Sequence, residues 1–450
     1  MTVQLAFEDG TLRLESDRQN DPPLDGLPGV KTDPRNDTFG APAYRYAAIR
    51  DVLRTLDADV DDRIAPTESL ALTTSYELRE YQQDALDVWG EHSRRGVLEL
   101  PTGAGKTVIA IAAIAAVSTP TLVVVPTIDL LEQWQRELEG EFDVPIGRLG
   151  GGEQRVEELT VATYDSAYLR AAELGDRFGL VVFDEVHHLG AAGYQDIARL
   201  LAAPERLGLT ATFERSDGAH ETIVELVGPR AYEITVDELA GDHLAPYEIR
   251  RIEVELTPAE RAEYDEAQGI FVEYVRQANI SFSSGSDYLQ LVKRSGNDPR
   301  AREALLAKQR AREVMMNAEN KHHKLGRILD RHSDDRIIVF TAHTDLVYRL
   351  SERFLLPAIT AETGAAERRD ILERFRDGTY SRIVAANVLD EGIDVPDANV
   401  GVVLSGSGSE REFTQRLGRI LRPKANDGRA VLYELVSAET AEERVAERRR

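Results

Sequence analysis

The sequence predicts an α/β protein with two parallel-sheet lobes, a small module in front of them and a helical insertion in the second lobe. From Tyr76 onward, short β-rich runs alternate with helical patterns, as in the βαβ units of a parallel sheet. This alternation begins again near Tyr247, and 450 residues exceed what one hydrophobic core usually supports. The expected boundaries are 1–70 for the module, 71–245 for lobe one, 246–450 for lobe two and 257–332 for the insertion.

The amino-terminal module differs from the rest of the chain in composition. Pro- and Asp-rich stretches occur at 21–23 and 33–37, and a helical pattern runs from Tyr44 to Leu56. Residues Asp57 to Pro66 are acidic and have no apolar periodicity, which indicates a linker. The first domain boundary is therefore expected there.

Each lobe is predicted to contain five strands. In lobe one they are Gly96–Leu100, Thr121–Val125, Leu159–Thr163, Leu180–Phe183 and Arg206–Leu209. In lobe two they are Ile252–Leu256, Ile337–Phe340, Arg382–Ala385, Val400–Leu404 and Ala430–Glu434. In open α/β sheets ligands bind beyond the carboxyl ends of the strands, so motifs that follow strands are the candidate sites.

The predicted insertion lies between the first two strands of lobe two. From Thr257 to His332 the chain is rich in Arg and Glu, has a helical pattern and is broken by the serine-rich segment Ser281 to Ser286.

The composition excludes several classes of protein. Without cysteine the chain has no disulfides, thiolate nucleophiles or cysteine-ligated metal sites. Its longest apolar run, Val108 to Val117, is too short to span a bilayer, and the acidic amino terminus lacks the basic segment of a secretory signal. We therefore expect a cytoplasmic protein with no membrane partner.

The net charge of −25 is the opposite of the basic footprint of most nucleic-acid-binding proteins. Lysine is scarce, arginine is abundant and acidic residues are spread along the chain, which resembles a halophilic proteome. At molar salt the Debye length falls to about 3 Å, so an acidic surface neither attracts nor repels a nucleic acid over distance. Short-range contacts from backbone amides, Thr and Arg would then provide binding.

A phosphate-binding loop follows the first predicted strand. Residues 100–107 read Leu-Pro-Thr-Gly-Ala-Gly-Lys-Thr and open a long apolar helix. The strict pattern has Gly where Leu100 stands, and a glycine-rich turn that only caps a helix is the alternative. In a phosphate loop the lysine reaches the β- and γ-phosphates and the hydroxyl ligates Mg²⁺. The sequence thus predicts ATP and Mg²⁺ at Thr102, Gly103, Ala104, Gly105, Lys106 and Thr107.

Two carboxylates follow the fourth predicted strand, in Val181-Val-Phe-Asp-Glu-Val-His-His188. Downstream of a phosphate loop, Asp184 is predicted to hold Mg²⁺ and Glu185 to orient or deprotonate the attacking water. A solvated turn is the alternative for this acidic pair taken alone. The spacing of His187 and His188 does not match a zinc motif and no third ligand is evident. We expect one of them, with His187 the candidate, to couple the site to other motifs.

Arginines at helical spacing occur in lobe two, in Gln415-Arg-Leu-Gly-Arg-Ile-Leu-Arg422. Arg416, Arg419 and Arg422 share one helix flank, and an arginine brought to a γ-phosphate from another domain stabilises transition-state charge. A solvated arginine face is the alternative, although Gly418 costs a helix about 1 kcal/mol. We predict catalytic roles for Gln415, Arg419 and Arg422, in a cleft that closes on ATP.

Further motifs resemble those of superfamily 2 helicases, whose two lobes are RecA-like. They are Leu78-Arg-Glu-Tyr-Gln82, Val125-Pro-Thr127, Gln133-Trp134, Val161-Ala-Thr-Tyr164, Leu207-Gly-Leu-Thr-Ala-Thr212, Val339-Phe-Thr341 and Asp390-Glu-Gly-Ile-Asp-Val-Pro396. The resemblance covers about 76–435. It implies adenine recognition at Arg79 and Gln82 and nucleotide contacts at Gly392 and Asp394.

Nucleic-acid contacts are expected at threonines that follow strands. The hydroxyls and amides of Thr127, Thr163 and Thr341 can reach phosphates, which gives affinity without sequence reading. A helix cap is the alternative for each of them. Phe282 and Tyr288 in the insertion are weaker candidates, because packing in a core is the favoured interpretation of both.

Within the superfamily the chain is most similar to the archaeal xeroderma pigmentosum group B (XPB) helicases. The shared features are Asp184-Glu-Val-His-His188, the position of the insertion, and Asp33-Pro-Arg35 with Ala41-Pro-Ala-Tyr-Arg-Tyr46 in the module. The resemblance implies ATP-dependent 3′ to 5′ translocation on duplex DNA, or its opening, in repair or transcription. The family carries an Arg-Glu-Asp wedge where this chain has Arg215-Ser-Asp217, so Ser216 puts strand separation in doubt.

Two other functions are consistent with these motifs. A nucleotide-gated clamp could grip duplex DNA and recruit a nuclease without productive unwinding, and Ser216 motivates that hypothesis. An RNA helicase is disfavoured because residues 184–187 do not read Asp-Glu-Ala-Asp.

Overall fold

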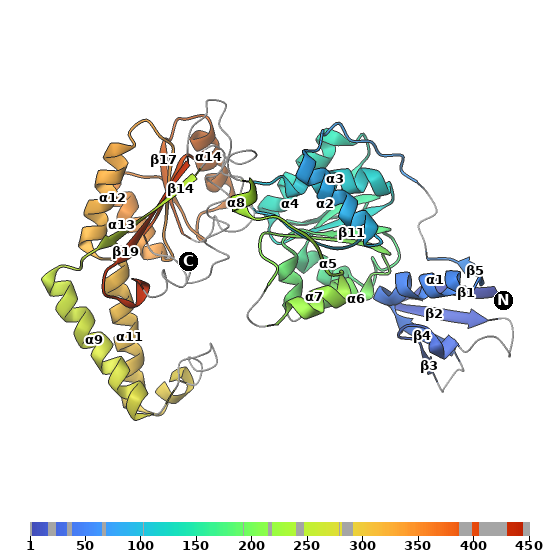
Figure 1. Ribbon diagram of the computed structural model, residues 1–450, viewed down its shortest axis with the longest axis horizontal. Helices are drawn as coiled ribbons and strands as arrows, with labels where there is room; N and C mark the ends of the chain where they lie inside the picture. The colour runs from blue at the N-terminus through green and yellow to red at the C-terminus, as the bar shows by residue number, and fades with distance from the viewer. Residues whose placement is uncertain are drawn as a thin grey trace. The chain divides into compact units, whose positions relative to one another are not determined.

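The computed structural model describes residues 2–16, 24–33, 38–64, 69–101, 103–191, 193–214, 218–239, 247–278, 280, 291–386, 398–404 and 430–443. The chain divides into two compact units, residues 1–239 and most of the chain from 240 onward (Figure 1). In the described parts of the chain no helix is long and apolar enough to cross a membrane.

The amino-terminal module is a small mixed sheet with one helix, α1 (Tyr46–Thr55), which confirms the predicted helix. Its strands, in spatial order, are β3 (Lys31–Asp33), β4 (Thr38–Pro42), β2 (Thr11–Ser16), β1 (Thr2–Glu8) and β5 (Asp59–Asp62). Short 3₁₀ turns at Leu24–Gly26 and Ala43–Arg45 complete it. The interior is apolar and includes Val3, Leu5, Tyr46, Ile49 and Leu53.

The prediction of a linker at 57–66 is wrong for Asp59–Asp62, which form β5 and pair in parallel with β1. Only Val60 packs toward the apolar interior, so the segment shows no hydrophobic periodicity. The acidic side chains find polar partners instead: the Gln4 amide donates to Asp61 at 2.9 Å and the Tyr46 hydroxyl donates to Asp62 at 2.5 Å. Charged residues of this kind are common on edge strands.

The module packs on the rest of the first unit. Ala202, which precedes the lobe-one strand at Glu205–Thr210, belongs to the module's apolar interior. The Tyr44 hydroxyl and the Arg45 guanidinium both donate to the Glu225 carboxylate, at 2.8 and 3.0 Å. The module is therefore attached to lobe one through an apolar contact and a polar one.

Lobe one is built on an eight-stranded sheet. In spatial order the strands are β13 (Arg230–Glu233), β6 (Arg95–Glu99), β12 (Glu205–Thr210), β11 (Leu180–Phe183), β7 (Thr121–Val125), β10 (Leu159–Thr163), β8 (Ile146–Gly150) and β9 (Glu153–Arg155). All neighbours pair in parallel except β8 and β9. The five predicted strands are confirmed, three of them at their predicted bounds.

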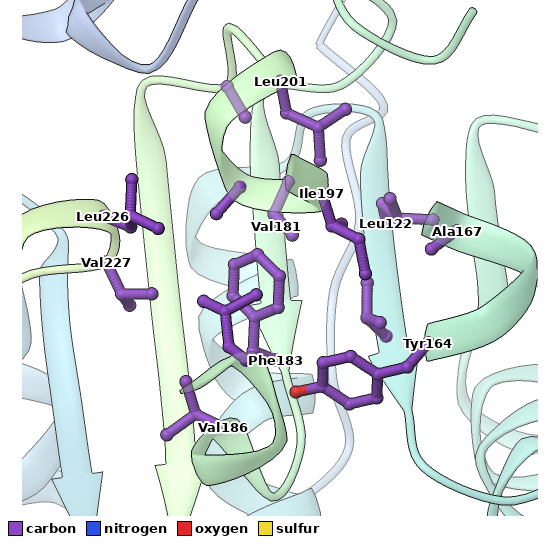
Figure 2. Packing of buried hydrophobic residues seen from close by; sticks show 14 of the residues in the cluster. Leu122, Tyr164, Ala167, Val181, Phe183, Val186, Ile197, Leu201, Leu226 and Val227 are labelled. Atoms are coloured by element: carbon purple, nitrogen blue, oxygen red, sulfur yellow. The ribbon is translucent and has the colours of Figure 1, made fainter. Parts of the chain in front are cut away.

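Helices connect these strands and cover the sheet. They are α2 (Glu80–Glu91), α3 (Lys106–Val117), α4 (Ile128–Glu141), α5 (Tyr164–Arg170), α6 (Gln195–Leu200), α7 (His220–Leu226) and α8 (Val236–Leu239), with a 3₁₀ segment η3 (Val186–Gly190) after β11. On one side of the sheet, side chains from α5, α6 and the end of α7 pack around Phe183 and Val181 (Figure 2). Because β7, β10 and β11 are buried throughout, their residues are apolar apart from threonines, and this pattern identifies them in the sequence.

Arg206 is a charged residue inside this core. It is 1% exposed, and its guanidinium donates to the backbone carbonyls of Ala198, Leu201, Ala203 and Leu226. Burial lowers the pKa of this guanidinium. Carbonyls near helix carboxyl termini lack partners within their helix, so Arg206 satisfies them and ties α6 and α7 to β12.

The second unit contains a six-stranded, wholly parallel sheet. In spatial order its strands are β14 (Tyr247–Val254), β19 (Ala430–Ser437), β18 (Val400–Val403), β15 (Ile337–Phe340), β17 (Arg382–Ala385) and β16 (Ala358–Ile359). The helices α13 (Thr344–Phe354) and α14 (Ala365–Arg376) connect them. The predicted strand Ile252–Leu256 is misplaced: β14 starts five residues earlier and ends at Val254, because charged residues on this edge strand hide it.

The insertion forms a pair of long helices that project from the sheet of the second unit (Figure 1). They are α9 (Pro258–Gln277) and α11 (Pro299–Met316), and α9 starts at a capping box made by Thr257 and Glu260. The next helix, α12 (Glu319–Arg331), instead packs Leu325, Ile328 and Leu329 into the core of the lobe. The candidates Ser281 to Ser286 and Tyr288 lie outside the described residues.

Lys321 on α12 is a fully buried lysine in this core. Its ammonium donates to the Leu404 carbonyl at 2.8 Å and to the Glu442 carboxylate at 2.6 Å. Burial lowers the pKa of Lys321, and the Glu442 carboxylate opposes that shift. The pair joins α12 to the end of β18 and to the segment after β19.

Replacing Lys321 by Met should destabilise the second unit, because it leaves the Glu442 carboxylate without its cation. Loss of one partner of a buried ion pair costs about 3 kcal/mol, so the free energy of unfolding should fall by that order, measured by urea denaturation in molar KCl. Lys324→Met, on the same helix but partly exposed, is the matched control. Adding Glu442→Gln should restore part of the loss, and a fully additive double variant would contradict the pairing.

Candidate active site

The phosphate loop lies between β6 and α3, at the carboxyl edge of the lobe-one sheet. Gly103 and Gly105 have φ angles of 86° and 79°, which side chains rarely adopt. A Cβ on Gly105 would lie 2.4 Å from the Gln82 amide nitrogen, so a larger residue does not fit there. Thr102 lies outside the described residues. The loop thus has the backbone that phosphate binding requires.

Two side chains of α2 hold this loop from behind. The Tyr81 hydroxyl and the Gln82 amide both donate to the Ala104 carbonyl, at 2.8 and 2.9 Å. The Gln82 carbonyl oxygen in turn accepts the backbone N–H of Arg79, which caps α2. Gln82 therefore supports the loop, and adenine recognition by Arg79 and Gln82 stays a prediction.

Lys106 and Thr107 start α3, on the first turn after the loop. The Lys106 ammonium donates to the Leu100 and Pro101 carbonyls, at 3.1 and 3.4 Å. It is close enough to Asp184 to lower the pKa of that carboxyl. Both side chains are partly exposed, so they are accessible to a phosphate.

Asp184 follows β11 and is 6% exposed. The Trp134 indole donates to its Oδ2 at 2.8 Å, and the Glu185 backbone N–H donates to its Oδ1 at 3.0 Å. The Tyr164 hydroxyl donates to its backbone carbonyl at 3.1 Å. Burial, followed by repulsion from the Glu185 carboxylate, raises the pKa of Asp184 to about 6, although Trp134 and Lys106 act against that shift.

Glu185 has a strained backbone, with φ 47° in the left-handed region. Such strain persists where surrounding structure enforces it and is concentrated at functional sites. Its side chain is also buried, and among the described residues its Oε2 accepts no hydrogen bond. Within the described part of the chain this oxygen is therefore available to accept a hydrogen bond.

His187 lies between this carboxylate and the end of β12. Its Nδ1 is 3.5 Å from Glu185 Oε2 and 3.3 Å from the Thr210 hydroxyl, which also donates to the Thr212 carbonyl. The Leu100 backbone N–H donates to the Thr210 carbonyl, so the motif after β12 lies beside the phosphate loop. A coupling role for His187 stays a prediction, and these contacts connect Glu185 to the motif after β12. Within the described ranges, no three His, Asp or Glu side chains form a metal cluster.

The residues present fit a magnesium nucleotide. Mg²⁺ prefers hard oxygen ligands, one or two carboxylates together with substrate phosphates. Asp184 and the Thr107 hydroxyl provide oxygens, Lys106 provides a cation, and Glu185 has a buried oxygen that accepts no hydrogen bond among the described residues. This set lies on one edge of one sheet.

The predicted nucleic-acid contacts differ in their environments. Thr127 caps α4 and Thr163 caps α5, each accepting a backbone N–H at 3.3 Å. Thr341 is fully buried and accepts the His343 N–H at 3.4 Å, so its hydroxyl does not reach the surface in this conformation. All three contacts stay predictions. Outside the described residues lie Arg215, Asp217, Gly392, Asp394, Gln415, Arg419 and Arg422.

The sequence did not assign roles to Trp134 or Tyr164 at this site. Each residue lies within a recognised motif, but the motif gave it no individual role. The available signal was an aromatic residue with a polar atom inside each motif, because an indole or phenol that becomes buried usually finds a hydrogen-bond partner.

Comparison with known proteins gives the family. Three family models match: xeroderma pigmentosum group B helicase damage recognition domain at 5–64, type III restriction enzyme, res subunit, at 75–215, and ERCC3/RAD25/XPB C-terminal helicase at 302–450. The DNA 3'-5' translocase XPB2 of Sulfurisphaera tokodaii is 43% identical over 424 residues, which are 94% of this chain and 96% of that protein. The chain belongs to the XPB family.

Two further relatives are less similar, and the matches cover about 60% of their length. The DNA 3'-5' helicase XPB of Mycobacterium tuberculosis is 31% identical, and the match spans 83% of this chain and 63% of that protein. The putative DNA 3'-5' helicase Rad25 of Halobacterium salinarum is 34% identical, with 85% and 58% covered. The crystal structure of the Pyrococcus furiosus Hef helicase domain matches with a TM-score of 0.54 at 18% identity, covering 82% of this chain and 98% of that one. That likeness confirms the RecA-like helicase fold.

The raised pKa of Asp184 predicts that this side chain destabilises the nucleotide-free protein at neutral pH. The folded state binds the proton more tightly than the unfolded state, so the penalty is complete above about pH 6 and disappears as the pH falls toward the ordinary value of 3.8. Asp184→Asn should therefore remove a penalty on the order of 2 kcal/mol at neutral pH, although its amide nitrogen meets one of the two N–H donors to the carboxylate.

Urea denaturation in EDTA over this pH range measures the effect. The advantage of the Asp184→Asn variant should fade as the pH falls below about 6. Asp84→Asn, an exposed aspartate on α2, is the control and should show no such dependence. An Asp184→Asn variant whose free energy of unfolding depends on pH as the parent's does would refute the assignment.

Proposed function

We propose that the chain is an ATP-dependent DNA translocase that uses Mg²⁺ and moves 3′ to 5′ in DNA repair or transcription. One observation carries the proposal: a phosphate loop and a buried Asp184–Glu185 pair occur on one sheet edge, in a chain of the XPB family. The relative named as a DNA 3'-5' translocase matches nearly its whole length, which supports translocation as the core activity.

The residues of lobe one have distinct tasks in this reaction. The amides of 103–105 and the Lys106 ammonium bind and orient the phosphates, while Thr107 and Asp184 hold the Mg²⁺. Bound Mg²⁺ neutralises charge on the β- and γ-phosphates. Glu185 orients the attacking water and accepts its proton, a role that fits a buried carboxylate oxygen with no hydrogen-bond donor among the described residues.

The second half of the site comes from the carboxyl-terminal part of the chain. We assign Gln415, Arg419 and Arg422 to the γ-phosphate, where guanidinium groups stabilise transition-state charge. Gly392 and Asp394 are assigned to the nucleotide. These assignments rest on the motifs, because the residues lie outside the described part of the chain.

DNA is the proposed partner, in duplex and single-stranded form. Thr127 and Thr163 both cap helices, and backbone N–H groups at helix starts favour phosphate oxygens. Contacts of this kind do not read sequence. They also suit a chain of net charge −25, since they need no long-range attraction.

A clamp that recruits a nuclease is the second candidate function. Ser216 in place of the family's acidic wedge residue favours it, because ATP hydrolysis and gripping of duplex DNA do not need that carboxylate. A translocase that tracks along duplex without separating it is intermediate between the two candidates.

Glu185→Gln should abolish ATP turnover and leave ATP binding intact. The amide keeps the size of the side chain but cannot accept the proton from water, so kcat should fall at least about 100-fold, as for loss of a general base. Turnover is measured by phosphate release with duplex DNA in molar KCl, and binding with a fluorescent ATP analogue. Glu173→Gln, an exposed glutamate of the same lobe, is the control. Hydrolysis at the parent rate in Glu185→Gln would disprove the assignment.

The Ser216→Glu variant separates unwinding from clamping. If the missing carboxylate limits strand separation, this variant should displace a strand from a 3′-tailed duplex several-fold faster than the parent, at equal ATPase rate. A fluorescence-quenching displacement assay in molar KCl measures it, with Ser216→Gln as the uncharged control. Robust unwinding by the parent protein alone would exclude a pure clamp.

A further inference from the structure

The Trp134 side chain donates a hydrogen bond to Asp184, the first residue of the acidic pair. Its indole is fully buried, and its Nε1 lies 2.8 Å from Asp184 Oδ2. The donor sits on α4 and the acceptor follows β11, so the contact joins two segments 50 residues apart. Hydrogen bonds from a neutral donor to a carboxylate are stronger than those between neutral groups. The indole has no other polar atom, so this bond is the sole polar role of Trp134.

Tyr164 makes a second contact with the same residue, from the neighbouring helix. It is 1% exposed, and its hydroxyl donates to the Asp184 backbone carbonyl at 3.1 Å. Figure 2 shows the ring extending from α5 toward Phe183 and Val186, which flank the acidic pair. Asp184 is thus held at its carboxylate from α4 and at its carbonyl from α5.

Both helices begin at a threonine that is a proposed DNA contact. Thr127 caps α4, and Trp134 follows it by seven residues, about two turns along the same helix face. Thr163 caps α5, and Tyr164 is its first residue. A Cβ built on Gly150 would lie 2.9 Å from side-chain atoms of both Leu131 and Thr163, so the two helix starts are packed against the same strand end.

We propose that Trp134 and Tyr164 are positioning residues that link DNA contact at the starts of α4 and α5 to the magnesium-holding carboxylate of Asp184. DNA that binds at Thr127 and Thr163 fixes the two helices, and their buried aromatic donors fix Asp184 in its ligand geometry. Interiors packed at protein density transmit such displacements instead of absorbing them. The inference rests on the proposed function and adds to it a physical route by which DNA stimulates ATP hydrolysis.

The chain provides a matched control for Trp134. Trp89 is the other of its two tryptophans, is 1% exposed and donates from its indole to the Arg206 carbonyl at 3.0 Å. Trp89→Phe and Trp134→Phe each remove one buried indole N–H from the same lobe. Only the second removes a donor to Asp184. A difference between the two variants therefore reports on the positioning role and not on packing.

The first experiment compares these variants and Tyr164→Phe in molar KCl. Affinity for a fluorescent, non-hydrolysable ATP analogue is measured in EDTA and in Mg²⁺, and ATPase rates are measured with and without duplex DNA. In Trp134→Phe the tightening of nucleotide binding by Mg²⁺ should fall about ten-fold, as expected for loss of one hydrogen bond to a charged group. The affinity of Trp134→Phe for the analogue in EDTA should stay within about two-fold of the Trp89→Phe value. The factor by which DNA stimulates its ATPase rate should also fall about ten-fold.

Tyr164→Phe should lose DNA stimulation with a smaller change in the response to Mg²⁺, because its hydroxyl holds the backbone of Asp184 and not the carboxylate. The proposal is overturned if Trp134→Phe matches Trp89→Phe both in the tightening of nucleotide binding by Mg²⁺ and in the stimulation of the ATPase rate by DNA. If Trp89→Phe itself shows no stimulation by DNA, the proposed function fails instead, and the two failures are distinguishable.

The second experiment needs no change at Trp134. In the Trp89→Phe variant Trp134 is the only tryptophan, so intrinsic fluorescence reports on its indole alone. Its emission should change when Mg²⁺ is added to the complex with the non-hydrolysable analogue, and again when duplex DNA is added. An emission that responds to neither addition overturns the proposal, even if Trp134→Phe does not fold.

Discussion

A carboxylate buried at the end of the central strand β11 is the constraint on which lobe one depends. Residues of β7, α4 and α5 form hydrogen bonds with Asp184, and burial raises its pKa to about 6. The fold tolerates this group because donors converge on it from the Glu185 backbone and the Trp134 side chain. Glu185, the next residue, adopts a left-handed backbone conformation with φ 47°. The protein thus loses stability at a position where the chemistry requires an ionised oxygen that is shielded from water.

Much of the architecture was predictable because the central strands of both sheets are buried on both faces. A strand buried on both faces is mostly apolar, and β7, β10 and β11 show that pattern, interrupted only by threonine, at their predicted bounds. Edge strands escape this rule. The edge strands β13 and β16 are short or polar, and β5 is acidic. Their pairing depends on neighbours distant in sequence, which local patterns do not reveal.

The site shows the same division between local and distant information. The phosphate loop and the acidic pair were predictable because each is a short motif with its chemistry inside one turn. The contacts that hold them were not. The indole that reaches Asp184 and the amide that reaches the Ala104 carbonyl come from other helices, brought there by the parallel order of the sheet. Gln82 shows the limit most clearly, since its motif predicts adenine recognition while its amide supports the loop backbone.

The distribution of cations in this acidic chain follows from salt screening. Exposed pairs such as Arg374 with Asp370 are in direct contact but are screened by ions in solution, so at molar salt they contribute little to stability. Cations that stabilise the protein or bind a ligand must then be buried or held at a binding site. Lysine is scarce in the sequence, yet one lysine, Lys106, stands in the phosphate loop and another, Lys321, is fully buried against Glu442. Arg206 is buried among backbone carbonyls. In a chain of net charge −25, these three cations thus lie where ions in solution cannot replace them.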